Sequence, residues 1–224
     1  KLIAFALFSC TFMGAVEMTI VTTAIPSVVR DLNGFNLSSY LFSIYLLTAS
    51  VATTIFGKLS DFYGRKKLLQ ISIVIFILGS LLCGLSNSMP LLIISRGVQG
   101  LGSGAISTLT MAMIGDIFVV EDRARIQGYN STVWSIGSLI APILGGIILI
   151  RLSWQWVFFI NVPIGILSMI LIHRSYKATE TKSDDKLDLK GLFTLTLIII
   201  CLIQAMSALE KHSIFSLNVG GLAV

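Results

Sequence analysis

The chain has 224 residues, of which 55% are hydrophobic and only 12% are charged, and its mean hydropathy is +0.91. Soluble domains carry about 25% charged residues, so this composition excludes a soluble enzyme, a disordered protein and a disulfide scaffold. The net charge is +5, and no basic patch indicates a nucleic-acid partner. Three cysteines lie far apart in apolar runs, so neither a disulfide framework nor a metal site is expected. No cofactor is expected either.

Continuous apolar runs predict membrane-spanning helices, because a span of about 20 residues is helical unless it belongs to a closed barrel, and these runs lack the alternation of barrel strands. The runs cover residues 3–25, 38–57, 67–86, 90–115, 125–150, 155–173 and 191–209, with an eighth from about 216. The predicted fold class is all-α transmembrane. Residues 1–174 form a six-span bundle, residues 175–190 a cytoplasmic linker, and residues 191–224 a seventh span with the start of an eighth. This organisation is typical of a protein built from six-span halves, of which we expect the chain to be a fragment.

The lysines and arginines of the loops indicate the orientation, because cytoplasmic loops carry the excess of these residues. One set of alternate loops holds most of them: Lys58, Arg65, Lys66, Lys67, Arg123, Arg125, Arg174, Lys177, Lys182, Lys186 and Lys190. The opposite loops hold Arg30, Arg151 and Lys211. The first set, and with it the N-terminus, is therefore expected in the cytoplasm.

Two charged side chains are expected deep within spans, where each costs at least about 2.5–3.5 kcal/mol and usually marks function. Glu17 precedes the expected end of span 1 at Pro26, and Arg96 follows the start of span 4 at Pro90. At about 1.5 Å per residue their depths are similar, so they can pair if spans 1 and 4 are neighbours. A carboxylate with a removable partner can bind and release a proton. The interpretation is proton coupling or cation binding; a structural ion pair, or an arginine that reaches the interface, is the alternative.

The segment between spans 2 and 3 reads GKLSDFYGRKK. Its Gly57 and Gly64 allow a tight turn and a close helix approach. Asp61 lies between them, where it can sit at a helix N-terminus or pair with Arg65. Asp116, at the end of span 4, is a second candidate partner for Arg65. An ordinary basic loop explains the basic residues, but not two glycines with an acid between them.

Small residues recur at helical spacing in two spans. In span 5, Gly137, Ala141 and Gly145 form one face that lets another helix approach closely. Pro142 is expected to bend this helix, and Gly146 ends the small-residue segment. Span 4 has a similar face of Gly100, Gly104, Thr108 and Ala112. Ordinary helix packing is an alternative explanation for both faces.

These segments resemble motifs of the major facilitator superfamily. GKLSDFYGRKK, residues 57–67, matches the superfamily's loop pattern G-x-x-x-D-x-x-G-R-[RK]-[RK] completely. RGVQGLGSGA, residues 96–105, resembles its span 4 motif, in which the arginine is implicated in proton transfer. GSLIAPILGG, residues 137–146, resembles the span 5 motif of antiporters, with Ala141 in place of a glycine.

Three further stretches narrow the resemblance to the 14-span drug:proton antiporters: EMTIVTTAIPSVVRDL (17–32), WQWVFFINVPIG (154–165) and DLKG (188–191). Glu17 replaces the usual aspartate of the span 1 motif and keeps the carboxylate. The resemblance implies a multidrug exporter of the bacterial cytoplasmic membrane, whose C-terminal half is missing here. Its partners would be protons, a hydrophobic, cationic drug-like substrate and the lipid bilayer.

The resemblance also implies roles for individual residues. It assigns Glu17 and Arg96 to proton coupling and substrate charge. It assigns Asp61, Arg65 and Asp116 to a cytoplasmic latch, in which Asp61 contacts a helix end of the second half. Pro142 and its neighbouring glycines would let span 5 bend or slide during alternating access.

Other functions remain open at this point. The same fold supports nutrient or metabolite symporters and uniporters, which the span 5 motif argues against, and the chain alone can be an inactive truncated half. An intramembrane enzyme is disfavoured, because the spans contain neither HExxH nor GxSxG, and His173 and His212 lie at loop positions. Candidates for a substrate cavity, with packing or lipid contact as the alternative, are Phe12, Met13, Tyr45 and Trp134.

Overall fold

The computed structural model describes residues 2–175 together with residues 191, 194, 197, 198 and 201. The chain divides into two compact units, Lys1–Asp185 and Lys186–Val224, and the helices below all belong to the first. The described residues of the second unit are helical. Most of the predicted linker and of the predicted seventh span, with Lys211 and His212, lie outside the described residues.

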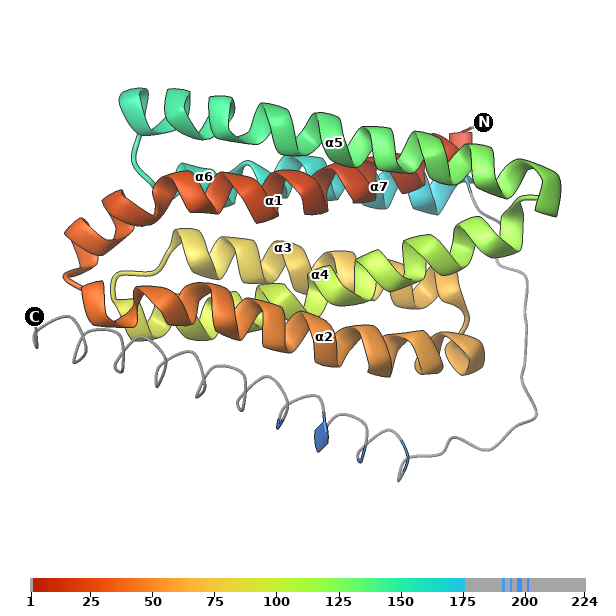
Figure 1. Ribbon diagram of the computed structural model, residues 1–224, viewed down its shortest axis with the longest axis horizontal. Coiled ribbons are helices and arrows are strands. Elements are labelled where there is room, and N and C mark those ends of the chain that lie inside the picture. Colours follow the sequence, from red (N-terminus) through yellow and green to blue (C-terminus); the bar gives the residue numbers. More distant parts are fainter. Residues whose placement is uncertain (1, 176–190, 192–193, 195–196, 199–200, 202–224) are drawn as a thin grey trace, which may run out of the picture. The chain divides into compact units, whose positions relative to one another are not determined.

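The first unit is a bundle of long helices joined by short connections (Figure 1). Its elements in chain order are α1 (Leu2–Leu32), the 3-10 helix η1 (Phe35–Leu37), α2 (Ser38–Tyr63), α3 (Arg65–Gly84), α4 (Met89–Ile117), α5 (Val120–Arg151), α6 (Trp156–Phe159) and α7 (Asn161–Ser175). The described residues contain no strand. The predicted all-α transmembrane fold is confirmed.

Five helical segments within the described residues are long and apolar enough to cross a membrane: α1, η1 with α2, α3, α5, and α6 with α7. The fourth predicted span, α4, has the length, at 29 residues, but is not among the five. Arg96, Gln99 and several glycines lower its mean hydropathy. Because Arg96 and Gln99 are buried within the bundle, they do not need contact with the lipid.

Two groups of helices make up this bundle. In one group α4 lies between α2 and α3, with which it makes the most extensive contacts of the unit, and in the other α1 packs against α5 and α7. In Figure 1, α5 and α1 lie together on one side of this unit, and α2, α3 and α4 lie together on the other side. The groups meet where α1 contacts α4 and where α3 contacts α7.

Glycines on α4 permit close approach on both of its sides. A Cβ at Gly104 would overlap the backbone of Ala49 in α2, and a Cβ at Gly102 would lie 2.5 Å from the backbone nitrogen of Phe76 in α3. The predicted small face of span 4, to which Gly104 belongs, is therefore a packing surface against α2. The second row, facing α3, was not predicted.

Helix ends differ from the predicted ones at two prolines. α1 continues through Pro26 to its end at Leu32, so the predicted end of span 1 at Pro26 is wrong, since packed helices tolerate one lost backbone hydrogen bond. The predicted sixth span is interrupted at Ile160, between α6 and α7, because Pro163 has no N–H to donate one turn back. His173, predicted in a loop, lies in the last turn of α7.

We expect Gly102→Ala to lower the stability of the bundle, because its Cβ would lie 2.5–2.7 Å from backbone atoms of Phe76, and overpacking of this kind costs about 1–3 kcal/mol. Gly115→Ala is the matched control in the same helix, since a Cβ there has no atom within 4 Å. Alanine favours helices by about 1 kcal/mol over glycine, so the control should be neutral or stabilising. Thermal unfolding of the protein in detergent measures both, and equal midpoints would contradict the expectation.

Candidate functional site

The two fully buried charges among the described residues form an ion pair. Glu17, in the middle of α1, is 0% exposed, and Arg96, on α4, is 1% exposed. Arg96 Nη1 donates to Glu17 Oε1, and Arg96 Nε donates to the carbonyl of Leu41 at 3.4 Å. An unpaired buried charge is costly, so each of the two side chains stabilises the other in this position. The pairing considered from sequence is therefore present, although the depth of Glu17 was estimated from the wrong helix end.

Polar side chains complete the hydrogen bonds around this pair. Gln99, on the same face of α4, accepts a bond from Arg96 Nη1 at 2.6 Å and donates to Ser80 Oγ of α3 at 2.8 Å. Asn161 Nδ2, at the start of α7, donates to Glu17 Oε2. We call these five residues the ion-pair network. Sequence reasoning missed the role of Gln99, which its spacing from Arg96 indicates. It also missed the role of Asn161, which lies inside the stretch WQWVFFINVPIG but has no spacing relation to Glu17.

Two aromatic rings face the guanidinium of Arg96. Its Cζ lies 4.1 Å from the ring centroid of Tyr45 on α2 and 5.9 Å from that of Phe158 on α6. The negative face of an aromatic ring attracts a cation at these distances. The rings therefore stabilise the arginine while contributing apolar surface.

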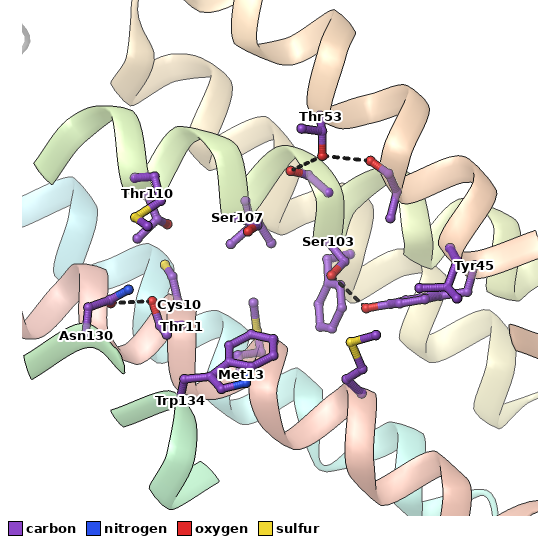
Figure 2. Close-up of a pocket in the computed structure, with 18 of the residues that line it drawn as sticks. Cys10, Thr11, Met13, Tyr45, Thr53, Ser103, Ser107, Thr110, Asn130 and Trp134 are labelled. Atoms are coloured by element: carbon purple, nitrogen blue, oxygen red, sulfur yellow. Dashed lines mark hydrogen bonds between the residues drawn. The ribbon is translucent and has the colours of Figure 1, made fainter. Parts of the chain in front are cut away.

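A pocket of about 490 Å³ opens between α1, α2, α4 and α5 (Figure 2). Along one side α4 contributes the hydroxyl groups of Ser103, Ser107 and Thr110, and opposite them α5 contributes Asn130 and Trp134. Methionines of α1 and α4 add apolar surface. None of the lining residues, all of which are described, is Asp, Glu, Lys or Arg. The lining is suited to a ligand with apolar surface and a few hydrogen-bonding groups.

Tyr45 belongs both to this pocket and to the surroundings of the ion pair. Its ring covers the guanidinium, and its hydroxyl donates to Ser103 Oγ at 2.7 Å, as Figure 2 shows. Of the other cavity candidates, Met13 and Trp134 line the pocket. Phe12 does not, and packs instead against an apolar cluster of the interior.

The predicted latch residues lie at the end of the bundle where α2 turns into α3. Gly64 alone links the two helices and has a φ of +83°, a conformation that favours glycine. Arg65 Nε lies 2.8 Å from Asp116 Oδ2, and Arg65 Nη2 lies 3.7 Å from Asp61 Oδ1. Gly57 lies within α2, where it faces α4. Both carboxylates are half-exposed, so these ion pairs orient the turn more than they stabilise the fold.

The small face of α5 packs against α1. A Cβ at Gly137 would lie 2.9 Å from the Cβ of Ala15, and Gly145 meets a threonine hydroxyl of α1. Pro142 is exposed, and a Cβ at Gly146 would have no atom within 4 Å, so neither belongs to this contact. α5 runs without interruption through Pro142.

Comparisons with known proteins agree on one family. The chain matches the family model described as Major Facilitator Superfamily over residues 7–218. It is 39% identical to the multidrug transporter protein MdtP of Bacillus subtilis (strain 168), covering 88% of this chain and 36% of that protein. It is 38% identical to the multidrug efflux pump SdrM of Staphylococcus aureus (strain N315), covering 95% of this chain and 47% of that protein.

A solved structure has the same fold. The human organic anion transporter MFSD10 superposes with a TM-score of 0.67 at 14% identity, covering 85% of this chain and 52% of that chain. The present chain thus spans about half of that transporter and 36% and 47% of the two bacterial relatives.

We expect Arg96→Met to destabilise the bundle by about 3–5 kcal/mol, because the Glu17 carboxylate then stays buried without its counter-charge. Adding Glu17→Met removes both charges and is expected to recover part of this loss. Thermal unfolding of the two single variants and the double variant in detergent forms a double-mutant cycle, with the exposed Arg151→Met as the matched control. Strictly additive effects would show that the two side chains do not depend on each other.

Proposed function

Because the chain belongs to the Major Facilitator Superfamily, we propose that it is the N-terminal half of a proton-coupled antiporter that exports hydrophobic, cationic drug-like compounds by alternating access. The observation that carries this proposal is a buried carboxylate–guanidinium pair beside a pocket without charged lining residues among those described. The names of the bacterial relatives support the substrate class. The chain covers less than half of their length, so the proposal includes a C-terminal half that completes the pathway.

Proton coupling would act through the charge of Glu17. The ionised carboxylate holds Arg96 by a charge-assisted hydrogen bond, which is about twice as strong as a neutral one. A proton that enters from the outer side neutralises the carboxyl group and weakens this hold. Since the pair joins α1 to α4, the protonation state acts on the contact between the two helix groups. Release of the proton to the inner side restores the pair.

The latch would close the inner side. Arg65 holds the α2–α3 turn against Asp116, which leaves the half-exposed Asp61 able to contact a helix end of the second half. Asp116 lies twenty residues beyond Arg96 on α4, about 30 Å of helix. The latch is therefore a separate site that does not contact the ion pair. The two sites share α4, so a movement of this helix would affect both.

The small face of α5 would permit motion along α1. Gly137 and Gly145 add no side chain of their own to the contact with α1, which would lower the resistance to a small shift along the helix axis. Pro142, which leaves one backbone carbonyl without its helical partner, would allow α5 to bend.

We place the transporter in the bacterial cytoplasmic membrane with its N-terminus in the cytoplasm. The end of the bundle with the α2–α3 and α4–α5 connections also carries most of the described basic residues: Lys58, Arg65, Lys66, Lys67, Arg123, Arg125 and Arg174. Arg30 and Arg151 lie at the opposite end. The positive-inside rule assigns the first end to the cytoplasm.

A second candidate function is symport or uniport of a neutral polar metabolite. The hydroxyl-rich pocket, with no charged residue among its described lining, favours it. Counterflow in proteoliposomes with an imposed pH gradient separates the two functions, because only an antiporter moves substrate against the direction of the proton.

In the intact transporter we expect Glu17→Gln to abolish drug efflux driven by a pH gradient, because an amide does not exchange protons at neutral pH. Drug counterflow at equal pH on both sides needs no net proton movement and is expected to continue. Fluorescent-substrate transport in proteoliposomes measures both. Glu121→Gln, an exposed carboxyl at the start of α5, is the matched control. Unchanged pH-driven efflux in Glu17→Gln would refute the coupling role.

We expect Asp61→Asn to slow transport about tenfold, the effect of losing one charge-assisted hydrogen bond, while the drug dissociation constant stays the same. The proposed latch closes the inner side and does not line the pocket. Turnover and equilibrium binding, measured on the same preparation, separate the two effects. Asp31→Asn, at an exposed carboxylate beside Arg30, is the matched control. Normal turnover in Asp61→Asn counts against the latch.

A further inference from the structure

Asn161 occupies a distinctive place in the ion-pair network. It is the first residue of α7, and its side chain is fully buried. Its Nδ2 donates to Glu17 Oε2, while its Oδ1 has no hydrogen-bond partner. A buried polar atom without a partner is rare in native proteins. The unpaired oxygen next to a proton-exchanging carboxyl group therefore points to a second arrangement in which this oxygen is used.

The two protonation states of Glu17 need different partners. A carboxylate only accepts hydrogen bonds, whereas a protonated carboxyl group has one O–H to donate, and Arg96 cannot accept. Gln99 Oε1 already accepts from Arg96 and from Cys83 Sγ. Among the unpaired buried side-chain oxygens of the described residues, Asn161 Oδ1 is the one whose residue already contacts Glu17.

The other groups around Glu17 do not offer this acceptor. Arg96 on α4, Tyr45 on α2 and Cys83 on α3 are the charged or titratable groups of the described residues that interact with Glu17. The Tyr45 hydroxyl is bonded to Ser103, and the Cys83 thiol is bonded to the glutamine of the network. In the described residues of α5, α6 and α7, no charged group faces Glu17.

We propose that Asn161 is a positioning residue that serves both protonation states of Glu17. Its Nδ2–H donates to the ionised carboxylate. When Glu17 takes up a proton, the amide turns half a rotation about its Cβ–Cγ bond, and Oδ1 accepts the new O–H. The rotation exchanges two groups of similar size, so the surrounding side chains keep their places. The proton stays on Glu17, and Asn161 neither gains nor loses one. This inference rests on the proposed function, because it requires that Glu17 be protonated during transport.

Infrared difference spectra of the intact transporter in liposomes, recorded between high and low pH with isotope-labelled asparagine, test this inference. Two bands are followed: the carboxylic acid band that Glu17→Gln removes, and the side-chain carbonyl band that the isosteric Asn161→Asp removes. We expect the asparagine band to move to lower frequency as the acid band appears, because its oxygen gains a hydrogen bond. Asn87→Asp, at an exposed amide, is the matched control and leaves the shift intact.

The two bands separate the inference from the proposed function. If the unmodified transporter shows no Glu17 acid band, the proposed coupling role fails and the inference with it. If the acid band forms and the asparagine band does not move, the inference alone is overturned. Both outcomes are read from spectra of the unmodified transporter, and the two nearly isosteric variants serve only to assign the bands.

Transport gives a second readout. Asn161→Leu, which is similar in size and neither donates nor accepts, is expected to lower turnover about tenfold at every pH, with the KM for drug changed less than about twofold. An asparagine that only anchored the carboxylate would confine the loss to the pH range in which Glu17 is ionised. A loss confined in this way, or unchanged turnover, contradicts the inference.

Discussion

A single buried charge in the apolar interior must find its counter-charge and its hydrogen bonds there, and this constraint organises the bundle. Glu17 and Arg96 neutralise each other across α1 and α4. Their remaining hydrogen-bonding atoms draw partners from further helices, Gln99 with its bond to α3 and Asn161 from α7. Apolar contacts tolerate repacking when volume is conserved, whereas these directed bonds do not. The network therefore defines the relative placement of four helices more narrowly than the apolar core around it.

The glycines of α4 make the network geometrically accessible. Because Gly102 and Gly104 let α3 and α2 touch the α4 backbone, side chains of both neighbours reach the arginine and its glutamine. On the other side, Gly137 allows α5 to pack closely against α1. The unit thus consists of two tightly packed helix groups, and the contact between them includes the ion pair of Glu17 and Arg96. On the proposed function, a change in the protonation of Glu17 acts at this contact, because the ion pair joins α1 to α4.

Much of this arrangement could be predicted from local sequence, and the remainder depends on neighbours. Apolar runs predict helices because the bilayer allows few other structures, and Glu17 and Arg96 stand out because charges in such runs are rare. The effect of Pro26 was misjudged, since a proline ends a helix only where surrounding residues do not support it. Asn161 lies 144 residues from its partner, and no spacing rule connects positions so far apart. Those parts of the site that join distant helices required the structure.

The placement of charge relative to the pocket limits how a cation can bind. The described lining residues include no carboxylate, and both oxygens of Glu17 are engaged, one by Arg96 and one by Asn161. A cation in the pocket therefore meets the aromatic rings of Tyr45 and Trp134. It also meets hydroxyl oxygens, which Ser131 and Ser135 contribute next to Trp134. It reaches the carboxylate of Glu17 only if Arg96 or Asn161 withdraws. In the proposed mechanism, a proton binds the same carboxylate. On the proposed function, cation and proton thus compete for one group, and a ligand that prefers one state of that group shifts the balance toward it. Exchange of one for the other then needs no direct contact between drug and proton.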